Sequence, residues 1–173
     1  MWTHRWGQVS SQMNLDNPHI LKLIHAIKEQ YVLEWRGIHG IAHWERVWEN
    51  GMQLAEQTGA DSEVVGYFAL FHDARRCNEG RDPDHGRRGA ELAAQWRGEL
   101  FHLHEEAFDQ LWFACVHHTD GMTEGDLSVQ VCWDADRLDL PRVGIQPEPH
   151  RLCTEAAKQR IRSDTSRAGK ASH

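Results

Sequence analysis

Apolar residues recur at steps of three and four along most of this chain, and strict alternation of polar and apolar residues is nearly absent. Steps of three and four place side chains on one face of an α-helix, whereas alternation is the pattern of a half-buried strand. The chain has only 5 prolines, so few positions forbid a helical backbone. Its 173 residues suffice for one domain around one core. The sequence therefore predicts an all-α fold, a single-domain helical bundle, with no internal repeat.

Capping and turn residues divide the chain into seven expected helices. Asn17 before Pro18 is a start signal, Asp61 is a typical N-cap, and Gly59 marks a helix end. We expect a helix from 18 to about 35, a second one that follows Gly37 and Gly40 and ends at 58, and further helices over 61–73, 85–96, 105–115, 127–136 and 150–162, with a surface loop over 75–84. The predicted organisation is an N-terminal segment (1–16), a helical domain (17–162) and a tail (163–173). This tail is expected to be disordered, because it has almost no large apolar residue.

Charge, hydropathy and cysteine spacing exclude several classes of protein. The net charge of −7 leaves no basic stripe for a nucleic acid duplex. The longest apolar run, 64–71, is far shorter than the about 20 residues that cross a bilayer, and the first residues lack the apolar core of a secretory signal. The 4 cysteines form no C-x-x-C pair and are expected to be reduced. We therefore expect a cytoplasmic protein without a membrane partner.

Histidines and aspartates fall on the apolar faces of several expected helices. His43 lies one turn before Val47, and His72 lies one turn after Phe68. His118, Asp73 and Asp136 occupy comparable positions on three expected helices. Burying such groups is costly unless they are paired or bound to metal, and side chains that converge from several helices are how a bundle builds a metal site. These five residues are therefore metal-ligand candidates.

A lone inward-facing histidine is, however, more often a hydrogen-bonded core residue than a ligand. Of the 13 histidines, eight are expected to be ordinary residues of termini, loops and polar faces, namely His4, His19, His25, His39, His102, His104, His150 and His173. The tryptophans at helical spacing (Trp44, Trp48 and Trp112) are expected to pack in the core. For Trp2, Trp6 and Trp35 a lid and simple packing both stay open.

The order His43, then His72-Asp73, then His118 and Asp136 resembles the HD-domain superfamily of metal-dependent phosphohydrolases. Three strings carry the resemblance: Gly-Ile-Ala-His-Trp-Glu-Arg-Val at 40–47, Phe-Ala-Leu-Phe-His-Asp at 68–73, and Asp-Ala-Asp-Arg-Leu-Asp at 134–139. It covers residues from about 38 to 142 and implies a helical bundle of the HD type. Asp136 matches the closing string better than Asp134, which stays the alternative.

Two further strings, at 84–93 and 116–121, resemble members of the superfamily that have extra histidines and hold two metal ions. This resemblance implies that His85 and His118 complete a second site and that Asp73 bridges the two. His117 is the alternative to His118, which the helical phase favours. Where many relatives have Gly-Lys after the His-Asp pair, this chain has Ala74-Arg75-Arg76-Cys77. Arg76 lies one turn after His72, where a guanidinium can hold phosphate oxygens.

The resemblance implies a metal-dependent phosphohydrolase, that is, a phosphomonoesterase, phosphodiesterase or pyrophosphatase, which acts on a small nucleotide-like phosphate ester or anhydride. One or two divalent ions (Mn, Mg, Ni, Co or Fe) would be held by His43, His72, Asp73, His85, His118 and Asp136. Asp73 would also be catalytic, and Arg76, with Arg87, would bind substrate phosphates. Two alternatives stay open: a di-iron oxygenase of the HD type, and a non-catalytic regulatory or binding HD domain.

Overall fold

The computed structural model of the chain describes residue 13 and residues 17–170, with side chains up to residue 164. Within these residues the regular elements are all helical, apart from an isolated bridge between Arg97 and Phe101. The all-α prediction is confirmed. The elements are α1 (Pro18–Gln30), α2 (Ile41–Thr58), α3 (Ser62–Phe71), α4 (His85–Trp96), α5 (Glu105–His117), α6 (Leu127–Arg137), the 3₁₀ helices η1 (Leu140–Val143) and η2 (Pro149–Arg151), and α7 (Glu155–Lys170).

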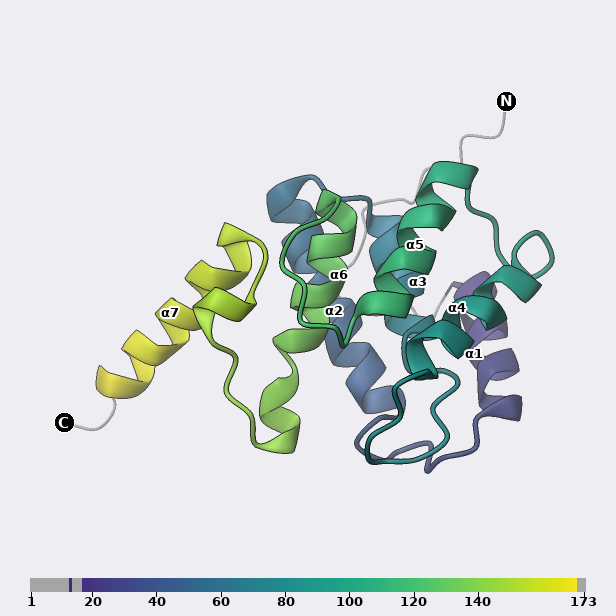
Figure 1. Cartoon of the computed structure of the whole chain (residues 1–173), viewed down its shortest axis with the longest axis horizontal. Helices are drawn as coiled ribbons and strands as arrows, with labels where there is room; N and C mark the ends of the chain where they lie inside the picture. The colour runs from purple at the N-terminus through teal and green to yellow at the C-terminus, as the bar shows by residue number, and fades with distance from the viewer. Residues whose placement is uncertain (1–12, 14–16, 171–173) are drawn as a thin grey trace.

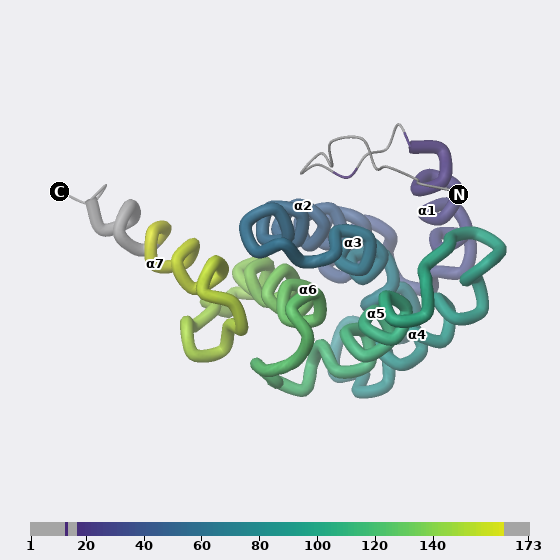
Figure 2. The backbone as a smooth tube through the Cα atoms, turned by 90° about the horizontal axis from the view of Figure 1, so that it is seen from above, coloured from purple at the N-terminus to yellow at the C-terminus, as the bar shows by residue number. Residues whose placement is uncertain are grey.

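Helix α3 lies at the centre of the bundle, between α2, α5 and α6 (Figure 1). Every residue from Val64 to Phe71 is buried, as expected for a helix that is apolar on all sides. Helix α4 packs against α5, whereas α7 projects from the body (Figure 2). Because α3 runs through the core, the His72-Asp73 pair at its end is placed inside the protein.

The helix ends follow the expected capping chemistry. The Asn17 side chain accepts a hydrogen bond from the backbone N–H of His19, and the Asp61 side chain accepts one from that of Glu63. Gly59 ends α2 with a φ of +80°, a left-handed conformation that glycine adopts without strain. The predicted starts of α1 and α3 and the predicted end of α2 are confirmed.

Two helices differ from their predicted bounds by more than two residues. Helix α1 ends at Gln30 instead of about Trp35, because the chain turns at Tyr31, whose ring makes edge contacts with Trp35 and Trp44. The last helix begins at Glu155 instead of His150, which lies in η2. It continues to Lys170, so residues 163–170 are helical where a disordered tail was expected. A lack of apolar residues predicts poor packing, but it does not prevent a polar segment from extending a helix that has already formed.

The tryptophan and cysteine predictions are confirmed where the structure describes these residues. Trp44 and Trp48 are buried, and Trp112 packs against the core. Trp35 packs on Trp44 with ring centroids 5.2 Å apart, whereas Trp2 and Trp6 lie outside the described residues. All four cysteines are free. Among the described helices, none has the length and apolarity that a bilayer crossing requires.

Three connecting segments meet at one end of the bundle (Figure 1). The α1–α2 connection (31–40) contacts the α3–α4 connection (72–84), because His39 Nδ1 lies 3.0 Å from Asp73 Oδ2. It also contacts the segment after α6, because Arg142 Nε donates to the Ile38 carbonyl. These segments surround the ends of the helices that carry the candidate ligands.

Candidate metal centre

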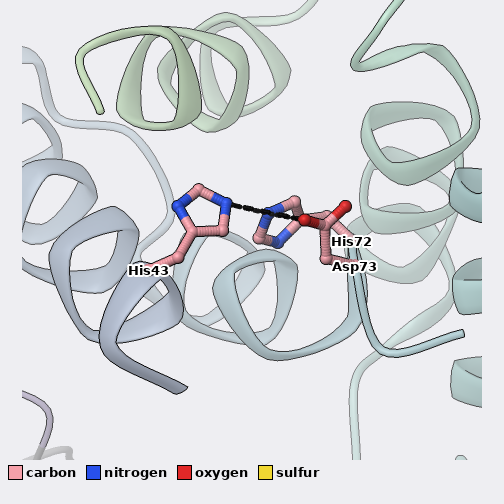
Figure 3. A group of neighbouring side chains, drawn as sticks. All are labelled: His43, His72 and Asp73. Carbon is pink, nitrogen blue, oxygen red and sulfur yellow. Dashed lines mark hydrogen bonds and ion pairs between the residues drawn. The ribbon is translucent and has the colours of Figure 1, made fainter. Parts of the chain in front are cut away.

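The structure brings the six candidate ligands together in the interior. They come from α2, the end of α3, the start of α4, the end of α5 and α6, and are His43, His72, Asp73, His85, His118 and Asp136. Two groups of three have ligand atoms within 4.8 Å of one another, and Asp73 belongs to both. Figure 3 shows the first group, His43, His72 and Asp73, with its side chains directed toward a common point. The second group is Asp73, His85 and His118.

Each of the four histidines donates a hydrogen bond from its Nδ1 atom. The partner in each case is a carbonyl or carboxylate oxygen, which is an acceptor and not a donor. His43 Nδ1 donates to the Asp139 carboxylate and His72 Nδ1 to the Phe68 carbonyl. His85 Nδ1 donates to the Asp82 carbonyl, and His118 Nδ1 to the Cys115 carbonyl. In a neutral imidazole with its proton on Nδ1, Nε2 is an acceptor. All four rings are thus fixed in the tautomer that offers Nε2 as a ligand.

The Nε2 atoms face one another in two pairs. His43 Nε2 lies 3.0 Å from His72 Nε2, and His85 Nε2 lies 2.8 Å from His118 Nε2. Two acceptors cannot satisfy each other, but a cation can satisfy both. Two ligands that bind a metal at about 2.1 Å and at right angles lie about 3 Å apart. The donor set therefore fits a metal ion at each pair.

Asp73 lies between the two pairs and presents one oxygen to each. Its Oδ2 atom lies 3.7 Å from His43 Nε2 and 3.9 Å from His72 Nε2. Its Oδ1 atom lies 3.0 Å from His85 Nε2 and 3.8 Å from His118 Nε2. A carboxylate in this position can bridge two ions.

The electrostatics of the cluster favour an ionised Asp73 and a neutral His72. Burial alone would raise the pKa of Asp73, but His72 and the other neighbouring histidines hold it well below the usual range. Burial lowers the pKa of His72 to about 3 against the opposing attraction of Asp73. Burial would also lower the pKa of His118, but its contact with Asp73 leaves that pKa raised. A proton and a metal ion therefore compete for His118.

Asp136 closes the first group from α6. Its Oδ1 atom lies 3.4 Å from His43 Nε2 and 3.9 Å from His72 Nε2. Its side chain is 17% exposed, against 3% or less for His43, His72 and Asp73. Asp136 is therefore the candidate ligand of this group that has the most contact with solvent. Asp134 points elsewhere: its carboxylate accepts from the backbone N–H of Cys153 and from Thr154.

The other candidates divide between the cluster and the surface. Arg76 is buried beside the second group, and its Nη1 atom lies 3.2 Å from His85 Nε2 and 3.6 Å from Asp73 Oδ1. Its Nε and Nη2 atoms donate to loop carbonyls, so only part of its guanidinium faces the cluster. Arg87 is exposed. His117 lies outside the cluster and pairs with Asp120 at 2.6 Å.

Sequence reasoning missed two residues around the cluster. His39 was expected to be an ordinary loop residue, but it is buried and its Nδ1 atom lies 3.0 Å from Asp73 Oδ2. Asp139 accepts from His43 and from Arg46 Nε, the latter at 2.6 Å. Asp139 stands in the closing 134–139 string, and His39 precedes His43 by four residues, so both were close to recognised motifs. Neither contact follows from helical periodicity, because both join segments far apart in the sequence.

Comparison with solved structures yields a neighbour over nearly the whole chain. It is the crystal structure of a predicted HD superfamily hydrolase from an uncultured Thermotogales bacterium, with a TM-score of 0.70 and 25% identity. The match covers 90% of this chain and 91% of that chain. No protein-family profile and no curated protein matches the chain. The fold is that of an HD domain, and the resemblance to the HD superfamily is confirmed. Together with the His/Asp cluster, this fold fits a metal-dependent hydrolase.

Proposed function

We propose that the protein is a metal-dependent phosphohydrolase that acts on a small nucleotide-like phosphate ester or anhydride. The observation that carries the proposal is the arrangement of two Nε2 pairs around one ionised carboxylate, Asp73. This arrangement offers nitrogen and oxygen ligands to one or two divalent ions, for which Mn, Mg, Ni, Co and Fe are the candidates. A divalent ion bound here supplies Lewis acidity, which lowers the pKa of a bound water and polarises a phosphoryl oxygen.

Some residues of the chain would hold the metal ions, and others orient the residues that hold them. His43, His72 and Asp136 would hold the first ion and His85 and His118 the second, with Asp73 shared between them. The Nδ1 hydrogen bonds keep these rings from rotating, so the ligands are organised before an ion binds. Asp73 is assigned the catalytic role, because it is the one carboxylate among the described residues that belongs to both groups.

Substrate phosphate would enter on the side of Asp136, whose side chain is partly exposed. The Nη1 atom of Arg76 faces the second group and is the part of the guanidinium that could bind a phosphate oxygen. Arg87 lies exposed on α4, two residues after His85, and is the second candidate for this role. The net negative charge of the chain does not oppose anion binding, because the ions and arginines set the local field.

The test is a screen of chelator-treated protein, resupplied with each candidate metal, against nucleotides, dinucleoside polyphosphates, cyclic dinucleotides and sugar phosphates. Hydrolysis is expected with at least one class. His72→Ala and Asp73→Ala should each lose bound metal and turnover, whereas His102→Ala, which changes an exposed histidine, should retain both. Full turnover by Asp73→Ala would contradict the assignment.

The screen also separates the two alternatives, because histidine and carboxylate ligands suit iron as well as manganese. Protein purified in air should be analysed for metal content and by optical spectroscopy. Two bound irons without phosphate release would favour an oxygenase. Bound metal without turnover on any of the tested substrates, and without two bound irons, would favour a regulatory domain.

A further inference from the structure

We propose that His39 is a positioning residue that fixes the orientation of the Asp73 carboxylate in the metal centre. The inference rests on the proposed function, since it assigns a role to a residue next to the proposed metal ligands. Its basis is a chain of contacts from Glu79 through the His39 ring to Asp73.

The contact between His39 and Asp73 selects one carboxylate oxygen. His39 Nδ1 donates to Asp73 Oδ2 at 3.0 Å, and Oδ2 is the oxygen that faces His43 and His72. On the other side, Arg76 Nη1 lies 3.6 Å from Oδ1. The carboxylate therefore has a hydrogen-bond donor at Oδ2 and a guanidinium beside Oδ1, and rotation about its side-chain bonds would break both contacts.

His39 touches a candidate ligand without joining the ligand groups. The described groups whose ligand atoms converge within 4.8 Å contain His43, His72, His85 and His118, but not His39. The His39 and His43 rings lie 6.3 Å apart, centroid to centroid. The Nδ1 atom of His39 faces the Asp73 carboxylate and not the histidine pairs. We therefore infer that His39 affects the metal centre through Asp73.

The surroundings of His39 hold the residue rigidly although it lies in a loop. Its carbonyl accepts two hydrogen bonds, from the Tyr31 hydroxyl and from Trp44 Nε1, both at 2.9 Å. Its Nε2 atom faces Glu79 Oε2 at 3.8 Å. A Cβ atom at Gly37 would lie 3.1 Å from the other Glu79 oxygen, Oε1. The α1–α2 connection thus contacts Glu79 of the α3–α4 connection at two residues, Gly37 and His39.

Two substitutions at His39 separate the hydrogen bond from the bulk of the ring. In His39→Asn, the side-chain amide nitrogen can occupy the place of Nδ1 and donate to Asp73, although the contact with Glu79 is lost. In His39→Leu, the volume is largely kept and both polar contacts are lost. His25→Leu is the matched control, because His25 is an exposed histidine on α1. Glu79→Gln tests the outer contact.

The measurement is the titration of each chelator-treated protein with Mn²⁺, by calorimetry and by electron paramagnetic resonance of the bound ion. Removing an outer hydrogen-bond partner of a metal ligand typically lowers affinity about 10–100-fold. We expect a loss of this size in His39→Leu, together with an altered Mn²⁺ spectrum. His39→Asn should stay within about threefold of the wild type, as should Glu79→Gln, because the Glu79 side chain is 43% exposed and its Oε2 atom lies 3.8 Å from His39 Nε2. The control should bind like the wild type.

Several outcomes would overturn the inference. Wild-type Mn²⁺ affinity in His39→Leu would show that Asp73 does not depend on His39. An equal loss in His39→Asn and His39→Leu would show that the hydrogen bond is not the cause. A wild-type chain that takes up none of the candidate ions, Mn²⁺ included, would overturn the proposed function and this inference together. A wild type that binds Mn²⁺ beside a His39→Leu variant that binds it equally well would overturn only the inference.

Discussion

His43 Nδ1 lies 2.7 Å from Asp139 Oδ2, although the two residues are 96 positions apart in the chain. Asp139 also accepts two hydrogen bonds from Arg46, at 2.6 and 3.1 Å. The carboxylate therefore fixes the ring of His43 from the side opposite to the Nε2 atom that faces the cluster. Contacts of this kind make a histidine a better ligand.

Replacing Asp139 should weaken metal binding without removing a ligand. In Asp139→Asn the charge beside His43 is lost, so we expect the Mn²⁺ affinity to fall about 10–100-fold. Calorimetric titration of chelator-treated protein measures the effect. Asp120→Asn is the control, because Asp120 is exposed and pairs with His117 outside the cluster. Unchanged Mn²⁺ affinity in Asp139→Asn would contradict the prediction.

Substitutions at Asp134 and Asp136 should have different effects, the first on stability and the second on metal binding. The buried Asp134 carboxylate accepts three hydrogen bonds of 2.7 Å from Cys153 and Thr154. Asp134→Ala leaves these donors without a partner and should lower the free energy of unfolding by about 3 kcal/mol, with Mn²⁺ affinity retained. Asp136→Ala should lose Mn²⁺ affinity and keep most of its stability. The measurements are urea unfolding of the metal-free proteins and titration with Mn²⁺. Loss of Mn²⁺ affinity in Asp134→Ala, with loss of stability in Asp136→Ala, would contradict the prediction.

Two glycines on α4 should not tolerate a side chain. A Cβ at Gly86 would lie 2.1 Å from the Cys115 carbonyl oxygen, and one at Gly89 would lie 2.1 Å from that of Phe71. We expect Gly86→Ala and Gly89→Ala each to lower the free energy of unfolding by about 1–3 kcal/mol, because α4 must move away from its neighbours. Gly80→Ala, whose Cβ would meet only Asn78 Oδ1 at 3.4 Å, is the control for chemical denaturation. Equal stability of all three variants would show that α4 shifts freely.

Metal removal should destabilise the protein, because a ligand that binds only the folded state raises its stability. At a free Mn²⁺ concentration 100 times the Kd, the expected gain is about 2.7 kcal/mol. Thermal unfolding with Mn²⁺ and with excess chelator measures the difference. The doubly substituted His72→Ala, Asp73→Ala protein should show no Mn²⁺-dependent shift. A persisting shift would place the stabilising ion elsewhere.

Asp82 should contribute a part of the stability that is lost in acid. Burial would raise the pKa of Asp82, but two hydrogen bonds from Arg88 and one from the Cys77 backbone lower it from 3.8. A carboxyl with a lowered pKa stabilises the folded state above its unfolded pKa, and this contribution disappears as the pH falls through the folded value. The stability difference between wild type and Asp82→Asn should therefore be full at pH 6 and shrink below about pH 4. Urea unfolding across this range is the measurement, and a difference that grows in acid would be the wrong sign.

Local sequence signals were sufficient for most helices and for the order of the ligands. The period of three to four residues and the caps at Asn17 and Asp61 act within one or two turns, so they can be recognised without the fold. The same holds for His43 and His72, since each stands one turn from an apolar residue of its own helix. These signals weaken where the chain leaves a helix, and the end of α1 and both ends of α7 were misplaced for that reason.

The sequence by itself determined a helical bundle with a small set of inward-facing histidines and aspartates. Only the tertiary structure decided which side chains meet: that Asp73 offers one oxygen to each histidine pair, that Asp134 caps a distant segment, and that His39 belongs to the metal centre. The physical reason is range. Helical periodicity depends on neighbours three or four residues away, whereas His39 and Asp73 are 34 positions apart and meet only when two loops close over the end of α3.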